Sequence, residues 1–100
     1  MNKTLAKINS TIVAEVCKKN NIYSLSLFGS YAHGDFTPQS DVDLLVRFSK
    51  PKSLLELVQI EREFRENLGK DVDLVTDDAL SPYLRDDVKK NLKLVYEQKG

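Results

Sequence analysis

Two spacings of apolar residues occur along this chain, and each predicts a different kind of element. Over residues 4–19 apolar side chains recur every three or four positions, which is typical of an amphipathic helix facing a core (Leu5, Ile8, Ile12 and Val16). Over residues 22–28 side chains alternate with a period of two, which predicts a strand with one face formed by Tyr23, Leu25 and Leu27. Gly29 and Ser30 interrupt this alternation, so we expect residues 30–34 to form a short helix or turn.

The middle of the chain repeats the strand and helix patterns. A loop at residues 37–40 precedes a predicted strand over 41–48, whose apolar face is formed by Val42, Leu44, Val46 and Phe48. Ser53 and Glu56 then fit a capping box for a helix that ends near Gly69. The apolar positions expected to face the core from this helix are Leu54, Leu57, Ile60, Phe64 and Leu68. Residues 71–76 alternate again and predict a third strand.

The last quarter of the chain predicts one more helix, followed by a segment that fits either of two structures. Ser81 and Pro82 are a typical N-cap and first helical residue, so we expect a helix from there to about Lys90. The alternation of Leu92, Leu94 and Tyr96 favours a short final strand, although a continued helix remains an alternative. The order of elements predicts an α/β (α+β) fold, with a mixed sheet whose helices pack mainly on one face.

Composition narrows the class of protein. A chain of 100 residues is the length of a single domain, so we expect one domain over residues 1–100. Its 15 Lys and Arg balance 15 Asp and Glu, which disfavours direct nucleic-acid binding and leaves solubility to an oligomer or a partner protein. Cys17 is the single cysteine, which excludes an intrachain disulfide. No stretch approaches the ~20 apolar residues of a membrane span, so we expect a cytoplasmic protein.

Three acidic residues lie on predicted strands where they could share a cation. Asp41 and Asp43 are two positions apart, so they project from the same strand face with Cα atoms about 6.6–6.8 Å apart. Asp73 is the candidate third carboxylate, from a neighbouring strand. Three such carboxylates would repel one another, which favours bound Mg²⁺ or Mn²⁺ over core packing, while a solvated strand edge is the alternative.

The Gly29-Ser30 turn is a candidate phosphate site. A strand that turns into a helix presents free backbone N–H groups to an anion, and glycine lets the anion approach closely. The hydroxyl of Ser30 adds a donor, although it could also serve as a simple helix cap. A phosphate site beside metal-binding acids would suit phosphoryl or nucleotidyl transfer.

These residues together resemble a known signature. Gly29-Ser30-Tyr31-Ala32-His33-Gly34, followed after five intervening residues by Ser40-Asp41-Val42-Asp43, is similar to the signature of the polymerase-beta nucleotidyltransferase superfamily. Within it, the chain resembles the minimal nucleotidyltransferases, or MNT-domain proteins. The resemblance implies two Mg²⁺ ions, with Mn²⁺ possible, held by Asp41 and Asp43, with Asp73 binding one of them and activating the attacking hydroxyl.

The resemblance also implies a nucleotide site and an activity. Gly29 and Ser30 would bind the β- and γ-phosphates of ATP, and His33 stands where the family usually has an arginine, either as a phosphate contact or as a surface histidine. Small members of this family act as antitoxins that transfer AMP to a tyrosine of a HEPN-domain toxin, which is the activity expected here. The alternatives are a non-catalytic subunit that binds nucleotide or masks a toxin, and a small-molecule nucleotidyltransferase of the aminoglycoside type that needs a second subunit.

Overall fold

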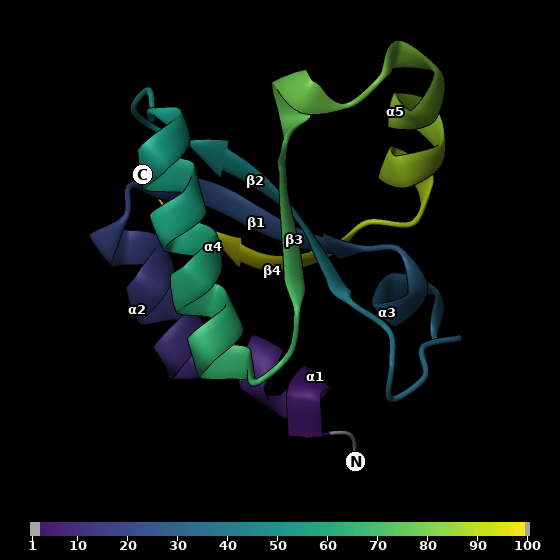
Figure 1. Ribbon diagram of the computed structural model, residues 1–100. Coiled ribbons are helices and arrows are strands. Elements are labelled where there is room, and N and C mark those ends of the chain that lie inside the picture. Colours follow the sequence, from purple (N-terminus) through teal and green to yellow (C-terminus); the bar gives the residue numbers. More distant parts are fainter. Residues whose placement is uncertain (1–2, 100) are drawn as a thin grey trace.

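The computed structural model has the predicted order of helices and strands, with the first helix divided in two and a 3-10 turn added after the third strand (Figure 1). The structure describes residues 3–99, and their side chains except at position 84. The helices are α1 (Lys3–Ile8), α2 (Thr11–Lys19), α3 (Ser30–His33), α4 (Leu54–Leu68) and α5 (Pro82–Lys90), with a 3-10 turn η1 (Asp77–Ala79). The strands are β1 (Ile22–Phe28), β2 (Val42–Phe48), β3 (Val72–Thr76) and β4 (Lys93–Glu97).

The four strands form one mixed sheet in the order β3-β2-β1-β4. β1 runs antiparallel to both β2 and β4, whereas β2 and β3 are parallel. Parallel neighbours require a crossover connection, and α4 supplies it. The predicted mixed sheet and the final strand are therefore confirmed. The alternative, in which the last helix continues past Lys90, is wrong, because α5 ends at Lys90. The N–H of its C-cap residue Asn91 donates to the carbonyl of Val88.

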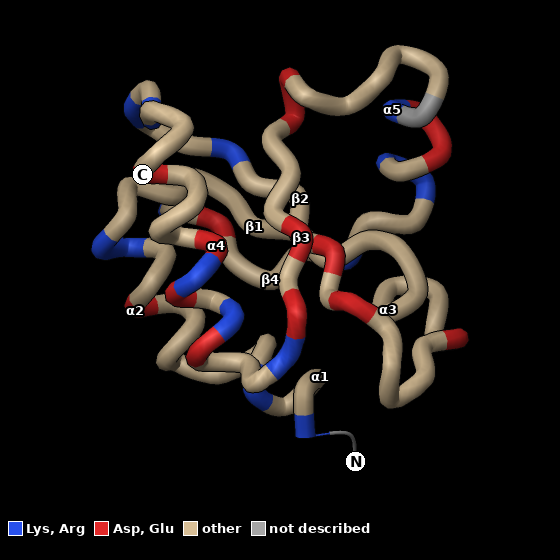
Figure 2. Tube along the Cα trace, in the orientation of Figure 1, with Lys and Arg blue, Asp and Glu red and all other residues tan. Residues whose placement is uncertain are grey.

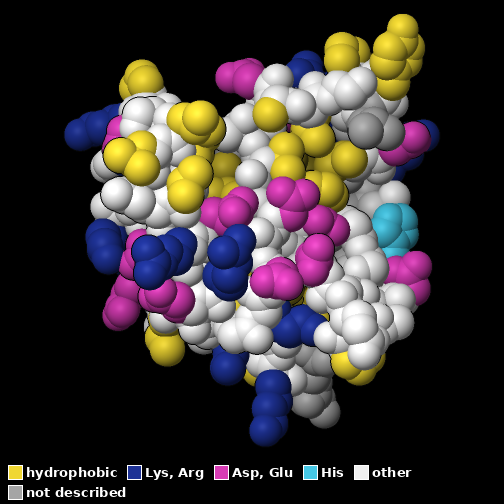
Figure 3. All heavy atoms as spheres, in the orientation of Figure 1, with side chains coloured by type: hydrophobic (Ala, Val, Ile, Leu, Met, Phe, Trp, Pro, Cys, Tyr) yellow, Lys and Arg dark blue, Asp and Glu magenta, His cyan; other side chains and the backbone are white. Residues whose placement is uncertain are grey.

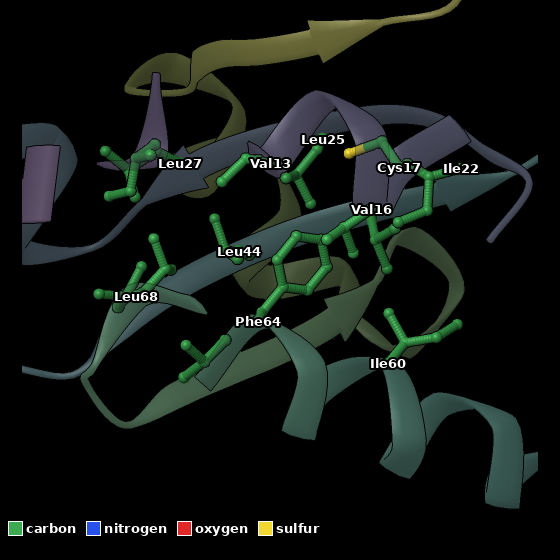
Figure 4. Close-up of a cluster of buried hydrophobic side chains, with 14 of the residues drawn as sticks. Val13, Val16, Cys17, Ile22, Leu25, Leu27, Leu44, Ile60, Phe64 and Leu68 are labelled. Carbon is green, nitrogen blue, oxygen red and sulfur yellow. The ribbon is translucent and has the colours of Figure 1, made fainter. Parts of the chain in front are cut away.

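The core lies between the sheet and the two helices α2 and α4, which cover one face (Figure 1). Phe64 of α4 is fully buried at the centre of this layer, beside Leu44 of β2 and Val16 of α2 (Figure 4). Cys17 is buried there too, and burial raises the pKa of its thiol to about 12. Cys17 is thus a core residue.

The first predicted helix is divided into two helices in the structure. α1 ends at Ile8 and α2 begins at Thr11, with Ser10 in the extended conformation of an N-cap. The Ser10 hydroxyl donates to the carbonyl of Lys7, because serine readily bonds nearby backbone instead of continuing a helix. The break rotates α2, so Val13 is buried and Ile12, expected in the core, is 54% exposed.

β1 also departs from strict alternation. The register shifts between Ile22 and Ser24, which is a β-bulge at Tyr23. A bulge inserts one residue and reverses the facing of the residues before it. Ile22 and Leu25 are therefore both buried, and Tyr23, expected on the side of Leu25, is exposed.

The buried residues of α4 begin at Ile60. Its capping box is present as predicted, because the Ser53 hydroxyl accepts from the N–H of Glu56 and the Glu56 carboxylate accepts from the N–H of Ser53. Ile60, Phe64 and Leu68 are buried, but Leu54 is 78% exposed. The expectation that Leu54 faces the core is therefore wrong.

The second face of the sheet is more open, as expected. Leu45 is buried on this face. The 3-10 turn η1, which the pattern did not predict, follows β3 directly. The carboxylate of Asp77 in η1 pairs with Arg47 at 3.7 Å and with Lys89 of α5 at 3.9 Å. No helix among residues 3–99 combines the length and the apolar character that crossing a bilayer requires.

Candidate active site

Strand register brings the three predicted acids to one region of the open face. β2 and β3 pair with Asp43 directly beside Asp73, and the N–H of Val42 donates to the carbonyl of Asp71 at 2.9 Å. Asp41 comes one residue before β2, two positions from Asp43 and thus on the same side of the strand. Acidic positions from these strands meet near β3 in Figure 2, and Figure 3 shows acidic side chains gathered over that strand.

Asp43 is the most enclosed of the three acids. Its side chain is half-buried, while Asp41 and Asp73 are exposed. Burial raises the pKa of the Asp43 carboxyl, and the negative charges of Asp73 and Asp41 raise it further. The three carboxylates therefore interact, and a positive charge among them would relieve their repulsion.

The three carboxylates are neighbours, but they do not converge on one point. Within the described part of the chain, no three Asp, Glu, His or Cys side chains form a group that could hold a metal ion as they stand. Asp41 and Asp73 are exposed, so both can turn toward Asp43 without disturbing the core. Carboxylate oxygens are the ligands that Mg²⁺ prefers, so the residues fit a divalent cation, and their metal role stays a prediction.

Gly29 brings the end of β1 against Asp43. Its φ of +70° lies in the region that favours glycine, and a Cβ atom at this position would collide with the Asp43 carboxylate. Phe28, just before it, pairs with Asp43 across the sheet. Gly29 and Asp43 are thus in direct contact, which fits a phosphate site beside a metal site.

The short helix α3 follows this turn and is anchored by its inner side. Tyr31 and Ala32 are buried, and the ring of Tyr31 stacks on Phe36 with centroids 4.4 Å apart. Ser30 is half-buried and His33 is exposed. The first N–H groups of a helix have no partner within it, so Ser30 begins α3 beside donors that an anion can use. The nucleotide-binding roles of Gly29, Ser30 and His33 stay predictions.

The loop before Asp41 is held by its own side chains. The Ser40 hydroxyl accepts from the N–H of Thr37 at 2.8 Å, and the N–H of Ser40 donates to the carbonyl of Thr37. Lys70 donates to the carbonyl of Pro38 in the same loop. These bonds fix the approach to Asp41, and they join the loop before β2 to the loop before β3.

Sequence patterns did not single out two residues near this site. Lys70 belongs to a loop, and Glu61 lies on the polar side of α4, where charged residues are expected in any amphipathic helix. Only the tertiary packing shows that Glu61 accepts a hydrogen bond from the backbone N–H of Leu74, next to Asp73. Arg47, which shares a strand face with Asp43, pairs with Asp77 at 3.7 Å.

The fold and these contacts define a class. The family model described as a nucleotidyltransferase domain matches residues 10–95, so the chain belongs to the nucleotidyltransferase domain family. It is a nucleotidyltransferase homologous to protein adenylyltransferases. The resemblance read from the Gly-Ser and Asp-Val-Asp motifs is thus confirmed at the level of the family.

Two relatives narrow the likeness further. MJ0435 of Methanocaldococcus jannaschii, provisionally named a protein adenylyltransferase, is 40% identical over 74 residues, which cover 74% of this chain and 80% of the relative. The protein adenylyltransferase MntA of Thermococcus cleftensis is 36% identical over 80 residues, which cover 77% of this chain and 81% of the relative.

Two solved structures share the fold. One, provisionally named a minimal nucleotidyltransferase, has a TM-score of 0.78 at 30% identity and covers 93% of this chain and 95% of its own. The other comes from a complex of a tri-AMPylated Shewanella oneidensis HEPN toxin with an MNT antitoxin, with a TM-score of 0.71 at 20% identity, covering 95% of this chain and 73% of its own. At that identity the second likeness shows the fold alone.

Proposed function

We propose that this protein transfers AMP from ATP to a tyrosine hydroxyl of a partner HEPN-domain toxin and thereby acts as its antitoxin. The observation that carries the proposal is the register of β2 and β3, which places Asp43 beside Asp73 and against the Gly29 turn. Relatives named as protein adenylyltransferases support the reaction type. The HEPN toxin paired with an MNT antitoxin of the same fold supports the choice of partner.

The acids and the turn divide the chemistry between them. Asp41 and Asp43 would hold two Mg²⁺ ions, or Mn²⁺ in their place, and Asp73 would hold one of them. When bound, these cations supply charge neutralisation for the phosphates and for the leaving pyrophosphate. The backbone at Gly29 and the hydroxyl of Ser30 would donate to the β- and γ-phosphate oxygens, which orients the α-phosphorus toward the open face.

Transfer then requires one bond to form and one to break. The tyrosine oxygen bonds to the α-phosphorus, and the bond from that phosphorus to the bridging oxygen of the β-phosphate breaks, releasing pyrophosphate. Asp73, which is exposed on the edge strand, accepts the proton of the attacking hydroxyl. An acceptor bound on the open face can reach Asp73 from solvent, so a partner surface can complete this site. We expect the reaction to take place in the cytoplasm.

The test is direct transfer to an authentic partner. The protein is incubated with ATP, Mg²⁺ and the HEPN protein encoded beside it, and intact-mass spectrometry follows the acceptor. We expect added mass in steps of one AMP, located on tyrosine by peptide fragmentation, and no addition with Asp43→Asn. No added mass on the authentic partner would reject the proposal, and AMP on a serine or threonine would reject the tyrosine assignment.

The second candidate is a subunit that neutralises its partner by contact alone. The exposed His33 in place of the usual arginine favours it, as do carboxylates that are not gathered among the described residues. The two functions separate in cells that express the toxin. If masking is the function, Asp41→Asn and Asp43→Asn will still protect these cells, whereas a catalytic antitoxin will lose protection.

A further inference from the structure

Asp73 lies on the edge strand of the sheet. β3 is the edge of the sheet and pairs only with β2 among the described strands. In the parallel ladder the backbone of Asp71 faces β2, because its carbonyl accepts from the N–H of Val42. Backbone groups alternate along a strand, so the N–H of Leu74 points away from β2, toward the open edge. An edge strand held from one side only would leave Asp73 poorly fixed.

Glu61 closes this edge at the residue after Asp73. Its Oε2 accepts a hydrogen bond from the N–H of Leu74 at 3.2 Å. The Glu61 side chain is 29% exposed, which is low for a carboxylate on the polar side of a surface helix. α4 is a firm base for it, because Phe64, one turn further on, is buried in the core. The carboxylate therefore ties β3 to the helix that packs the core.

Arg65 extends this tie to the other side of Asp73. Its guanidinium donates to Oε1 of Glu61 at 3.1 Å, and its Nε lies 3.9 Å from the Asp71 carboxylate. Glu61 thus has both oxygens occupied by donors within hydrogen-bond distance. Leu74 and Asp71, which flank Asp73 in the sequence, are both connected to one turn of α4.

We propose that Glu61 is a positioning residue for Asp73, which holds the outer edge of β3 so that the Asp73 carboxylate faces the cation held with Asp43. This inference rests on the proposed function, since it assigns Asp73 to the metal site. Glu61 touches neither substrate nor cation in this role and acts only through the backbone of β3. Without it, the Leu74 N–H would bond to water, and Asp73 would spend less time in the geometry that binds metal.

The test measures metal binding and hydrogen exchange, with transfer as a third readout. Mn²⁺ binding to the full chain is followed by electron paramagnetic resonance, and exchange of the Leu74 amide by NMR. For Glu61→Ala we expect about tenfold weaker Mn²⁺ binding, the lower end of what lost support around metal ligands costs. The Leu74 amide should exchange faster in this variant. AMP transfer should need a correspondingly higher Mg²⁺ concentration, while the KM for ATP stays within about twofold.

Two further variants separate position from charge. Glu61→Gln keeps an oxygen acceptor for Leu74 but loses the charge, so we expect Mn²⁺ binding within about twofold of wild type. Glu66→Ala removes the same charge from the same helix, at a side chain that is 69% exposed and pairs with Arg62. This control should change neither Mn²⁺ binding nor the exchange of the Leu74 amide. Equal Mn²⁺ affinity in wild type and Glu61→Ala would overturn the proposal, as would no Mn²⁺ binding by wild type or a Gln variant as weak as Ala. Wild type that binds Mn²⁺ yet transfers no AMP would instead reject the proposed function.

Discussion

The two faces of β2 serve different purposes within one strand. Val42, Leu44 and Val46 point into the core beneath α2 and α4, and all three are buried. Asp43, which lies between Val42 and Leu44, points to the open face, where burial and two acidic neighbours raise the pKa of its carboxyl. The helix-covered face therefore stabilises the fold, while the open face carries groups that cost stability. Substitutions on the two faces should separate stability from activity.

The largest expected effect is the loss of transfer on the open face. Asp43→Asn should lower the proposed AMP transfer by about 1,000-fold, because it removes a carboxylate that would hold both proposed cations. The same change should raise the Tm of the metal-free protein by a few degrees at pH 7, since it removes a charge that burial and repulsion disfavour. Activity assays and thermal unfolding check the two outcomes together.

The pH dependence of that Tm difference has a definite sign. A carboxyl whose pKa is raised in the folded state binds protons more readily there than in the unfolded chain, whose aspartates titrate near ~3.9. Below that pH, wild type and Asp43→Asn should have similar Tm values. The advantage of the variant should appear as pH rises through the raised pKa of Asp43. A lower Tm for Asp43→Asn at pH 7 would show that the charge stabilises the fold.

The second effect concerns the covered face. Phe64→Ala should lower the free energy of unfolding by about 3–5 kcal/mol, because it leaves a cavity at the centre of the core. Transfer per folded molecule, measured at low temperature, should stay within about twofold of wild type, since Phe64 lies on the far side of the sheet from the acids. Urea titration gives the folded fraction that the rates must be divided by. A large loss of rate per folded molecule would show that the two faces are coupled.

The third and smallest effect tests the contact between the turn and the acid. Gly29→Ala should lower transfer by about 100-fold, because its Cβ would displace the Asp43 carboxylate. Gly34→Ala is the matched control, since Gly34 also has a positive φ, of +85°, but an added Cβ there meets nothing within 4 Å. Both variants carry backbone strain, so the difference between their transfer rates measures the Asp43 contact. Equal rates would mean that strain alone matters.

Local patterns predicted the site better than the packing around it. Alternation alone placed Asp43 and Asp73 on strands with the correct facing, and a capping box at Ser53 predicted the start of α4. The break at Ser10 was not predictable from spacing, because the apolar residues before and after it fit one helix as well as two. The bulge at Tyr23 depends on pairing with β2, which no single segment encodes.

The side-chain contacts around the site could not be predicted from the sequence for a different reason. The bond from Leu74 to Glu61 depends on how α4 sits on the edge of the sheet, and a glutamate on a wet helix face carries no sign of it. The pairing of Asp77 with Arg47 and Lys89 likewise joins three elements. Such contacts become visible only when the fold is known.

The crossover between β2 and β3 has a consequence for synthesis of the protein. A chain emerging from the ribosome displays the Gly29 turn and Asp43 well before Asp73, which follows α4. Since parallel pairing cannot begin until α4 has crossed the sheet, a nascent or truncated chain that ends before β3 has no complete set of acids. The proposed AMP transfer should therefore begin only once β3 has left the exit tunnel and joined β2.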